Sequence, residues 1–373
     1  MSGAALFQLA LVGLAIAAVP LGWVWVKKGT DRSRRLVWVT LFLTFDLILF
    51  GAFTRLTDSG LGCPDWPGCY GYSNPLAAAR EIATAEAAMP TGPVTFTKAW
   101  IEMIHRYLAM AVGALITAVM VLAWRSRAER SPWPATAIFL LVCIQGAFGA
   151  WTVTLKLMPV IVTIHLLLGV TLLCALGLLA VTWSERPGLP VAAVTSLHLP
   201  ARLALAAVFM QIALGGWVST NYAVLACQDF PLCNGAWMPE GDFARGFDIT
   251  RSLGMNDDGT FLPVQALVAI HWVHRAFALV VTGTLLWLAF AVLRGRHTRE
   301  LDRSAWGLIG LLALQIASGV SNVVFAWPLA VAIVHNGGAA LLALTLVLVN
   351  ARLVLRAAAS ASVPLHAHAS LRH

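Results

Sequence analysis

The chain has 373 residues, of which 59% are hydrophobic and only 11% are charged, and its mean hydropathy is +0.80. A soluble domain carries about 25% charged residues, so this composition excludes an ordinary soluble protein and indicates one that lies in a bilayer. The formal charge of +8 does not indicate nucleic-acid binding, because Lys and Arg cluster in short loops between apolar runs, as on the cytoplasmic side of membrane proteins.

Apolar runs of about 20 residues, long enough to cross a membrane, occur nine times along the chain. They lie at about 4–26, 36–56, 98–124, 133–153, 160–183, 199–219, 264–293, 304–326 and 330–354. The first run has no basic residue before it and Lys27 and Lys28 after it, whereas a cleaved signal peptide carries its charge first. The sequence therefore predicts an all-α polytopic membrane protein whose first helix is retained.

Basic residues predict the orientation of these spans. With nine spans, the basic loops all fall on one side: Lys27, Lys28, Arg32, Arg34, Arg35, Arg125, Arg127, Arg130, Arg294, Arg296, Arg299, Arg303, Arg352 and Arg356. The positive-inside rule makes that side the cytoplasm. We therefore expect an external N-terminus, a cytoplasmic C-terminus and two long external loops, 57–97 and 220–263.

The second half of the chain repeats landmarks of the first at a distance of about 164 to 170 residues. The matched pieces are Cys63–Cys69 with Cys227–Cys233, His105-Arg106 with His274-Arg275, Gln145 and Gly149 with Gln315 and Gly319, and His165 with His335. Each repeat unit contains four spans, and the two units have the same orientation in the membrane. We expect two tandem pseudo-symmetric four-helix bundles, with the first span outside them.

This repeat predicts the domain organisation. Residues 1–35 form the extra N-terminal helix and a basic cytoplasmic loop, 36–198 the N-terminal bundle with its external cysteine loop, 199–356 the C-terminal bundle with the second cysteine loop, and 357–373 a flexible cytoplasmic tail. The polar segment 245–260 is assigned only as external loop. His366, His368 and His373 lie in the tail, outside any span, and are not counted as ligands.

Four repeated histidines lie a few turns inside the outer ends of their helices, at similar depth. Two inward-facing histidines per bundle suit a planar cofactor with two axial ligands, and haem iron accepts paired imidazoles. The pairs are His105 with His165 and His274 with His335. A buried imidazole bonded to a neighbouring helix is the alternative for any single one. A zinc site is disfavoured because no further carboxylate or Cys at helical spacing joins either pair.

Glu102 lies three residues before His105, so the two share a helix face. An ionisable residue inside a span costs roughly 2.5 kcal/mol or more, which indicates a function. The second half has His271 at the equivalent place, so only the first bundle carries a carboxylate beside its predicted cofactor. Such a group suits proton handling, although it could also bond a neighbour. Arg106 and Arg275 could pair with haem propionates or extend to the outer interface.

Of the six cysteines, Cys143 and Cys174 lie within spans and are expected to be small apolar side chains. The other four form two Cys-x5-Cys pairs in loops that face an oxidising compartment. Both motifs contain Pro and Asp, which favour a turn that brings the two sulfurs together. We expect disulfides between Cys63 and Cys69 and between Cys227 and Cys233. A structural role is the first interpretation of these disulfides, and a redox-active role is the second.

Together these motifs resemble the haem A synthase family over residues 36 to 354. The matching pieces are the run from Thr54 to Cys69, Glu102-x-x-His105-Arg106, His165, His274-Arg275, His335 and the second cysteine pair. The resemblance implies oxidation of the C8 methyl of haem O to a formyl group, which gives haem A for cytochrome oxidase. The chain departs from the simpler eight-helix pattern by its extra N-terminal span and its long second loop.

The resemblance also implies residue roles and partners. His105 and His165 would bind the substrate haem, His274 and His335 an electron-transferring haem B, and Glu102 would be the catalytic carboxylate. His271 is a further imidazole close to the second site. The implied surroundings are the lipid of a bacterial inner membrane, a haem O synthase as substrate donor, cytochrome oxidase assembly factors and an electron donor or acceptor.

Three competing functions explain only part of the pattern. A bis-histidine cytochrome b that only transfers electrons accounts for the four histidines but leaves Glu102 and the asymmetry of the halves unexplained. A thiol oxidoreductase accounts for the cysteine pairs but not for the histidines. A haem-delivery protein would need no carboxylate at one site alone.

Overall fold

The computed structural model describes residues 3–27, 31–184, 195–256, 258–295 and 298–361. Within these ranges the regular structure is helical, and extended pairing is limited to isolated bridges in loops. Nine of the described helices are long and apolar enough to cross a membrane, so the prediction of an all-α multi-pass membrane protein is confirmed. They are α1 (Gly3–Val26), α2 (Arg32–Leu56), α4 (Phe96–Arg125), α5 (Trp133–Thr154), α6 (Pro159–Thr182), α7 (His198–Thr220), α9 (Val264–Arg294), α10 (Arg299–Val324) and α11 (Leu329–Ala361).

Helix starts follow local capping chemistry. The Thr95 hydroxyl accepts a hydrogen bond from the Lys98 backbone N–H at 3.2 Å and so caps α4. Thr298 caps α10 in the same way, and two acidic residues in the first turn suit the positive end of the helix dipole. The predicted start of this span at 304 was therefore five residues late, because hydropathy alone does not detect a polar first turn.

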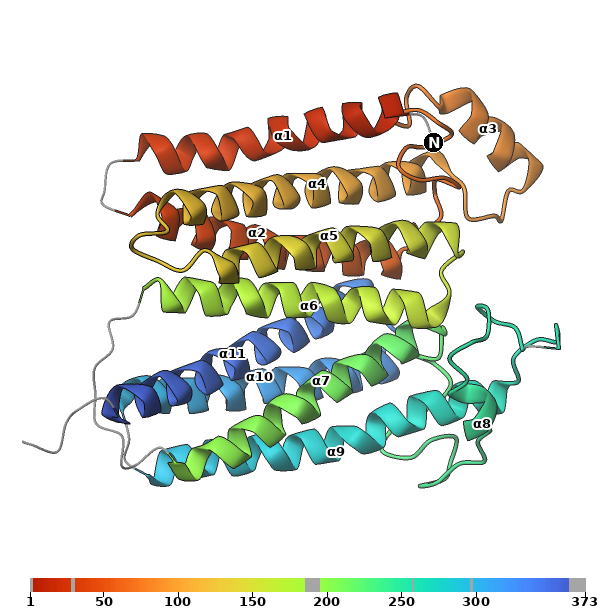
Figure 1. Ribbon diagram of the computed structural model, residues 1–373. Helices are drawn as coiled ribbons and strands as arrows, with labels where there is room; N and C mark the ends of the chain where they lie inside the picture. Colours follow the sequence, from red (N-terminus) through yellow and green to blue (C-terminus); the bar gives the residue numbers. More distant parts are fainter. Residues whose placement is uncertain (1–2, 28–30, 185–194, 257, 296–297, 362–373) are drawn as a thin grey trace, which may run out of the picture.

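The spanning helices pack as two closed rings of four. In the first ring α2 contacts α4, α4 contacts α5, α5 contacts α6, and α6 returns to α2. In the second ring α7, α9, α10 and α11 follow one another in the same way. Consequently α4 and α6 are diagonal partners in the first ring, as are α9 and α11 in the second. The rings join through α2, α6, α7 and α11, and α1 packs outside them against α4 (Figure 1).

Both cysteine loops lie at the same end of the helices (Figure 1). Each carries a short helix that hydropathy does not detect, α3 (Ala79–Ala88) in the first loop and α8 (Phe243–Gly246) in the second. The segment 245–260, expected only as loop, is anchored by Arg251, which is 1% exposed and donates a 2.5 Å hydrogen bond to the Asn221 side chain. At the opposite end α11 continues to Ala361, and the three tail histidines lie outside the described residues.

Candidate functional site

In the first ring, the predicted ligands His105 and His165 lie on the diagonal helices α4 and α6. Each imidazole packs against a glycine of a neighbouring helix. A Cβ on Gly51 of α2 would lie 3.0 Å from His105 Nε2, and a Cβ on Gly149 of α5 would lie 3.2 Å from His165 Cε1. All four helices therefore contribute to one layer in which histidine and glycine alternate around the ring.

The second ring repeats this layer. A Cβ on Gly215 of α7 would lie 3.0 Å from His274 Cε1, and a Cβ on Gly319 of α10 would lie 3.3 Å from His335 Cε1. The two histidines again lie on diagonal helices, here α9 and α11. Each glycine leaves space where a neighbouring helix brings an imidazole. Because this pairing occurs at all four histidines, it is a repeated feature of the fold and not the chance burial of one histidine.

The histidine–glycine layers fit a planar group with two axial ligands. The members of each pair lie on helices that are diagonal in their ring of four. All four histidines keep an accessible portion. The buried Nδ1 of His165 has no hydrogen-bond partner, so this imidazole is not the saturated histidine of a packed core. In the described part of the chain no cluster of three or more His, Cys, Asp or Glu side chains could hold a metal ion.

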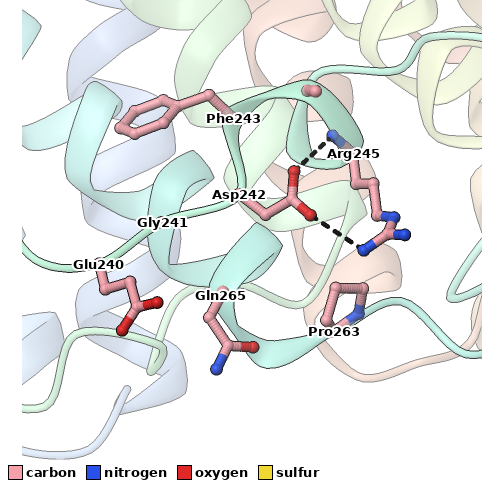
Figure 2. A pocket seen from close by; sticks show the side chains of 8 residues that line it. Glu240, Gly241, Asp242, Phe243, Arg245, Pro263 and Gln265 are labelled. Carbon is pink, nitrogen blue, oxygen red and sulfur yellow. Dashed lines mark hydrogen bonds and ion pairs between the residues drawn. The ribbon is translucent and has the colours of Figure 1, made fainter.

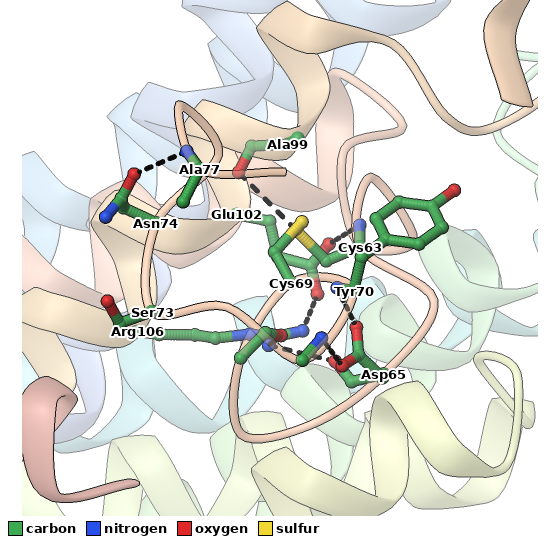
Figure 3. Close-up of a disulfide and its surroundings, with 12 residues drawn as sticks. Cys63, Asp65, Cys69, Tyr70, Ser73, Asn74, Ala77, Ala99, Glu102 and Arg106 are labelled. Carbon is green, nitrogen blue, oxygen red and sulfur yellow. Dashed lines mark hydrogen bonds and ion pairs between the residues drawn. A yellow bond between two sulfur atoms is a disulfide. The ribbon is translucent and has the colours of Figure 1, made fainter. Parts of the chain in front are cut away.

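Glu102 lies just above the first layer and is 3% exposed. Its Oε2 accepts a 2.8 Å hydrogen bond from the Cys63 backbone N–H, and its Oε1 forms an ion pair with Arg106 (Figure 3). In the second half the Cys227 backbone N–H donates to His271 Nδ1 at 3.2 Å. Glu102 and His271 therefore hold the same position under their loops, and the two halves differ there in chemistry rather than in geometry.

The arginine after each first histidine holds a cysteine loop. Arg106 Nη1 donates to three backbone carbonyls between Asp65 and Gly68, at 2.5 to 3.1 Å. Arg275 donates to three carbonyls between Asp229 and Leu232, at 2.9 to 3.1 Å. Each loop is thus tied to the helix that carries the His. Pairing of either arginine with a haem propionate stays a prediction.

An aspartate inside each cysteine motif closes a tight turn behind the second cysteine. Asp65 accepts the backbone N–H groups of Tyr70 and Gly71, and the turn places both residues at positive φ, where a glycine is favoured. In the second loop Asp229 accepts the same pair of N–H groups, from Gly235 and Asn234. These hydrogen bonds, the one from Gly235 above all, lower the pKa of Asp229.

The structure joins each cysteine pair within its own loop, Cys63 to Cys69 and Cys227 to Cys233. We expect peptide mapping without reductant to recover these two linkages, because the aspartate-closed turns hold the sulfurs of each loop together. The cysteines within the spans, Cys143 and Cys174, should be alkylated as free thiols once the protein is unfolded, and they serve as the internal control. Linkage between the two loops would contradict local pairing.

Two features were not predicted from the sequence. The first is an inter-bundle contact at the loop end: Arg55 of α2 donates to the Ser219 carbonyl of α7 at 2.5 Å, and Tyr222 donates to Asp58. The repeat could have indicated it, since Ser219 is the counterpart of Arg55. The second is a surface pocket beside α8, lined by Glu240, Asp242, Arg245 and Gln265 among others (Figure 2). No predicted site residue lines that pocket.

The chain is similar to known proteins over most of its length. Residues 34–347 match the family described as Cytochrome oxidase assembly protein. A protein named Heme A synthase from Shewanella oneidensis is 42% identical over 315 residues, covering 84% of this chain and 94% of the relative. Proteins of the same name from Caulobacter sp. and Sphingopyxis alaskensis are each 30% identical, covering 85% and 86% of this chain and 95% and 92% of their own lengths.

Proposed function

The chain belongs to the cytochrome oxidase assembly protein family, and from this membership we propose that it is a haem A synthase, an oxidoreductase that converts the C8 methyl of haem O to a formyl group. Its product, haem A, serves cytochrome oxidase. The observation that carries this proposal is the asymmetry between two otherwise repeated layers: both have diagonal histidines, but only the first has a buried carboxylate, Glu102.

We assign substrate binding to the first layer. His105 and His165 would be the axial ligands of haem O, and Glu102 would accept protons at the haem edge. With the oxygen atom taken from water, conversion of a methyl to a formyl group releases four electrons and four protons, so protons must leave the site as electrons do. A positioned base contributes about 10²–10⁴-fold to such proton transfers.

We assign a resident haem B to the second layer, with His274 and His335 as its ligands. When bound, this haem would supply one-electron transfer between the substrate site and an external acceptor. His271 has its Nδ1 engaged by the Cys227 backbone N–H, which supports His274 rather than His271 as the ligand on α9. Arg106 and Arg275 would close the two sites by holding the disulfide loops over them.

The surroundings we propose follow from the same assignment. The protein would lie in a bacterial inner membrane with its disulfide loops and N-terminus external and its C-terminus cytoplasmic. It would receive haem O from a haem O synthase, pass haem A to oxidase assembly factors, and exchange electrons with a separate donor or acceptor.

The test is extraction of haem after expression in a host that makes no haem A of its own. With haem O supplied, we expect a formyl-bearing haem, identified by mass spectrometry and by the pyridine haemochrome spectrum. Without haem O, only haem B should be recovered. Haem B alone under both conditions would favour the bis-histidine cytochrome b, which moves electrons but does not modify haem.

A further inference from the structure

The two layers differ at the Nδ1 atoms of their histidines. In the second layer the Ser318 hydroxyl of α10 lies 2.9 Å from His335 Nδ1 and 2.7 Å from the Leu314 carbonyl. A carbonyl can only accept, so both contacts are hydrogen bonds only when the hydroxyl proton goes to Leu314 and the serine oxygen accepts from Nδ1–H. This arrangement selects the tautomer in which His335 Nε2 has a free lone pair.

A free Nε2 lone pair is what an iron ligand requires, and hydrogen bonding at the other ring nitrogen makes the imidazole a stronger donor. Ser318 is 5% exposed, so water does not compete for this hydrogen bond. On α7, Gln211 Nε2 lies 3.2 Å from His274 Nδ1 and donates to the His274 carbonyl at 3.0 Å. An amide N–H only donates, so Gln211 offers His274 Nδ1–H no acceptor of the kind that Ser318 offers His335. Within the second layer, the hydroxyl that supports a ligand tautomer is therefore that of Ser318.

The first layer has apolar residues at the corresponding positions. Phe148 replaces Ser318, and Leu47 replaces Gln211. As a result His165 Nδ1 is buried with no partner, and within the described ranges the His105 ring packs on Phe50, with 6.3 Å between centroids, instead of forming a hydrogen bond. The helices, histidines and glycines are repeated, whereas the groups that support the imidazoles are not.

We propose that Ser318 is a positioning residue that makes the second layer a permanent haem site, and that Phe148 at the matching place makes the first layer an exchangeable one. This inference rests on the proposed function, because a synthase must retain its electron-transferring haem and release its product. Removal of a hydrogen bond to a metal-ligating histidine typically costs 10–100-fold in affinity. Release of haem from the two sites should therefore differ by about that factor.

The experiment measures transfer of haem B from the purified full-length protein to excess apomyoglobin, in a His165→Ala background that leaves only the second site. Ser318→Ala should speed transfer by about 10–100-fold. It should also raise the reduction potential, because a weaker donor stabilises ferric iron less. Ser318→Thr keeps the hydroxyl and should behave like the parent. A parent that holds no haem would refute the proposed function, whereas a parent and Ser318→Ala with equal transfer and potential would refute only this inference.

The reciprocal experiment adds a hydroxyl to the first site, in a His274→Ala background loaded with haem B. Phe148→Ser should slow transfer from this site. Phe148→Ala is the matched control, because it removes the same ring from its contact with Trp151 without adding a hydroxyl. Equal rates for the two variants would overturn the assignment of exchangeability to position 148, and slower transfer in Phe148→Ser alone would support it.

Discussion

Replacement of Glu102 by Gln should leave substrate haem bound but stop its conversion to haem A. The expected loss is about 10²–10⁴-fold, the usual contribution of a positioned base. Glutamine is nearly isosteric, and its side-chain oxygen can still accept the Cys63 N–H. Haem O, or a partly oxidised hydroxymethyl form, should accumulate on the protein, as measured by extraction and mass spectrometry after expression with haem O.

The structure supplies a competing explanation that the experiment must exclude. Glu102 also anchors the first disulfide loop, through Cys63 and Arg106, so its loss could act by displacing the loop. In the variant, Arg106 can still donate hydrogen bonds to three carbonyls of the loop. Peptide mapping of the Cys63–Cys69 disulfide would verify that the loop is intact. His271→Gln is the matched control, since it changes the equivalent loop anchor in the other half. Equal loss in both variants, or undiminished haem A in Glu102→Gln, would show that the carboxylate is structural.

The residues of the candidate site that the sequence could single out are the repeated ones, because repetition distinguishes a weak motif from a chance match. His105, His165, His274 and His335 each look ordinary alone, and become informative as two matched pairs at similar depth. The spans were predictable for a related reason: a bilayer imposes a length and an apolar composition that hydropathy detects directly. Helix ends were less predictable where a polar turn lies at a span boundary, as in α10.

The supporting contacts were not predictable from pattern alone. Arg106 follows His105 in sequence. Its hydrogen bonds to loop carbonyls, however, depend on how the external loop 57–97 folds back onto α4. Ser318 is one of many hydroxyl residues in the spans, and only the packing of α10 against α11 brings it to His335. Such side chains belong to no periodic face, so a one-dimensional signal does not single them out.

The second large effect concerns the resident haem. Substitution of His274 or His335 by Ala should abolish the low-spin haem B signal of the purified protein, because a bis-imidazole site that loses one ligand loses its six-coordinate iron. Optical spectra and the ratio of extracted haem to protein measure the effect. His105→Ala is the control from the first layer, and it should leave the haem B signal in place.

His271 decides how the His274 variant is interpreted. It lies one turn before His274 on α9 and could in principle take over the iron. Its Nδ1 accepts the Cys227 N–H, however, and its side chain is 4% exposed beneath the loop that Arg275 also holds. Ligation of iron by His271 would require it to leave that contact and the loop to lose an anchor.

We therefore expect that His271 does not restore the low-spin haem signal in His274→Ala. A low-spin signal that is retained in His274→Ala but lost in a His271→Ala, His274→Ala double variant would identify His271 as an alternative ligand. A normal spectrum in both His274→Ala and His335→Ala would instead place the resident haem outside the second layer.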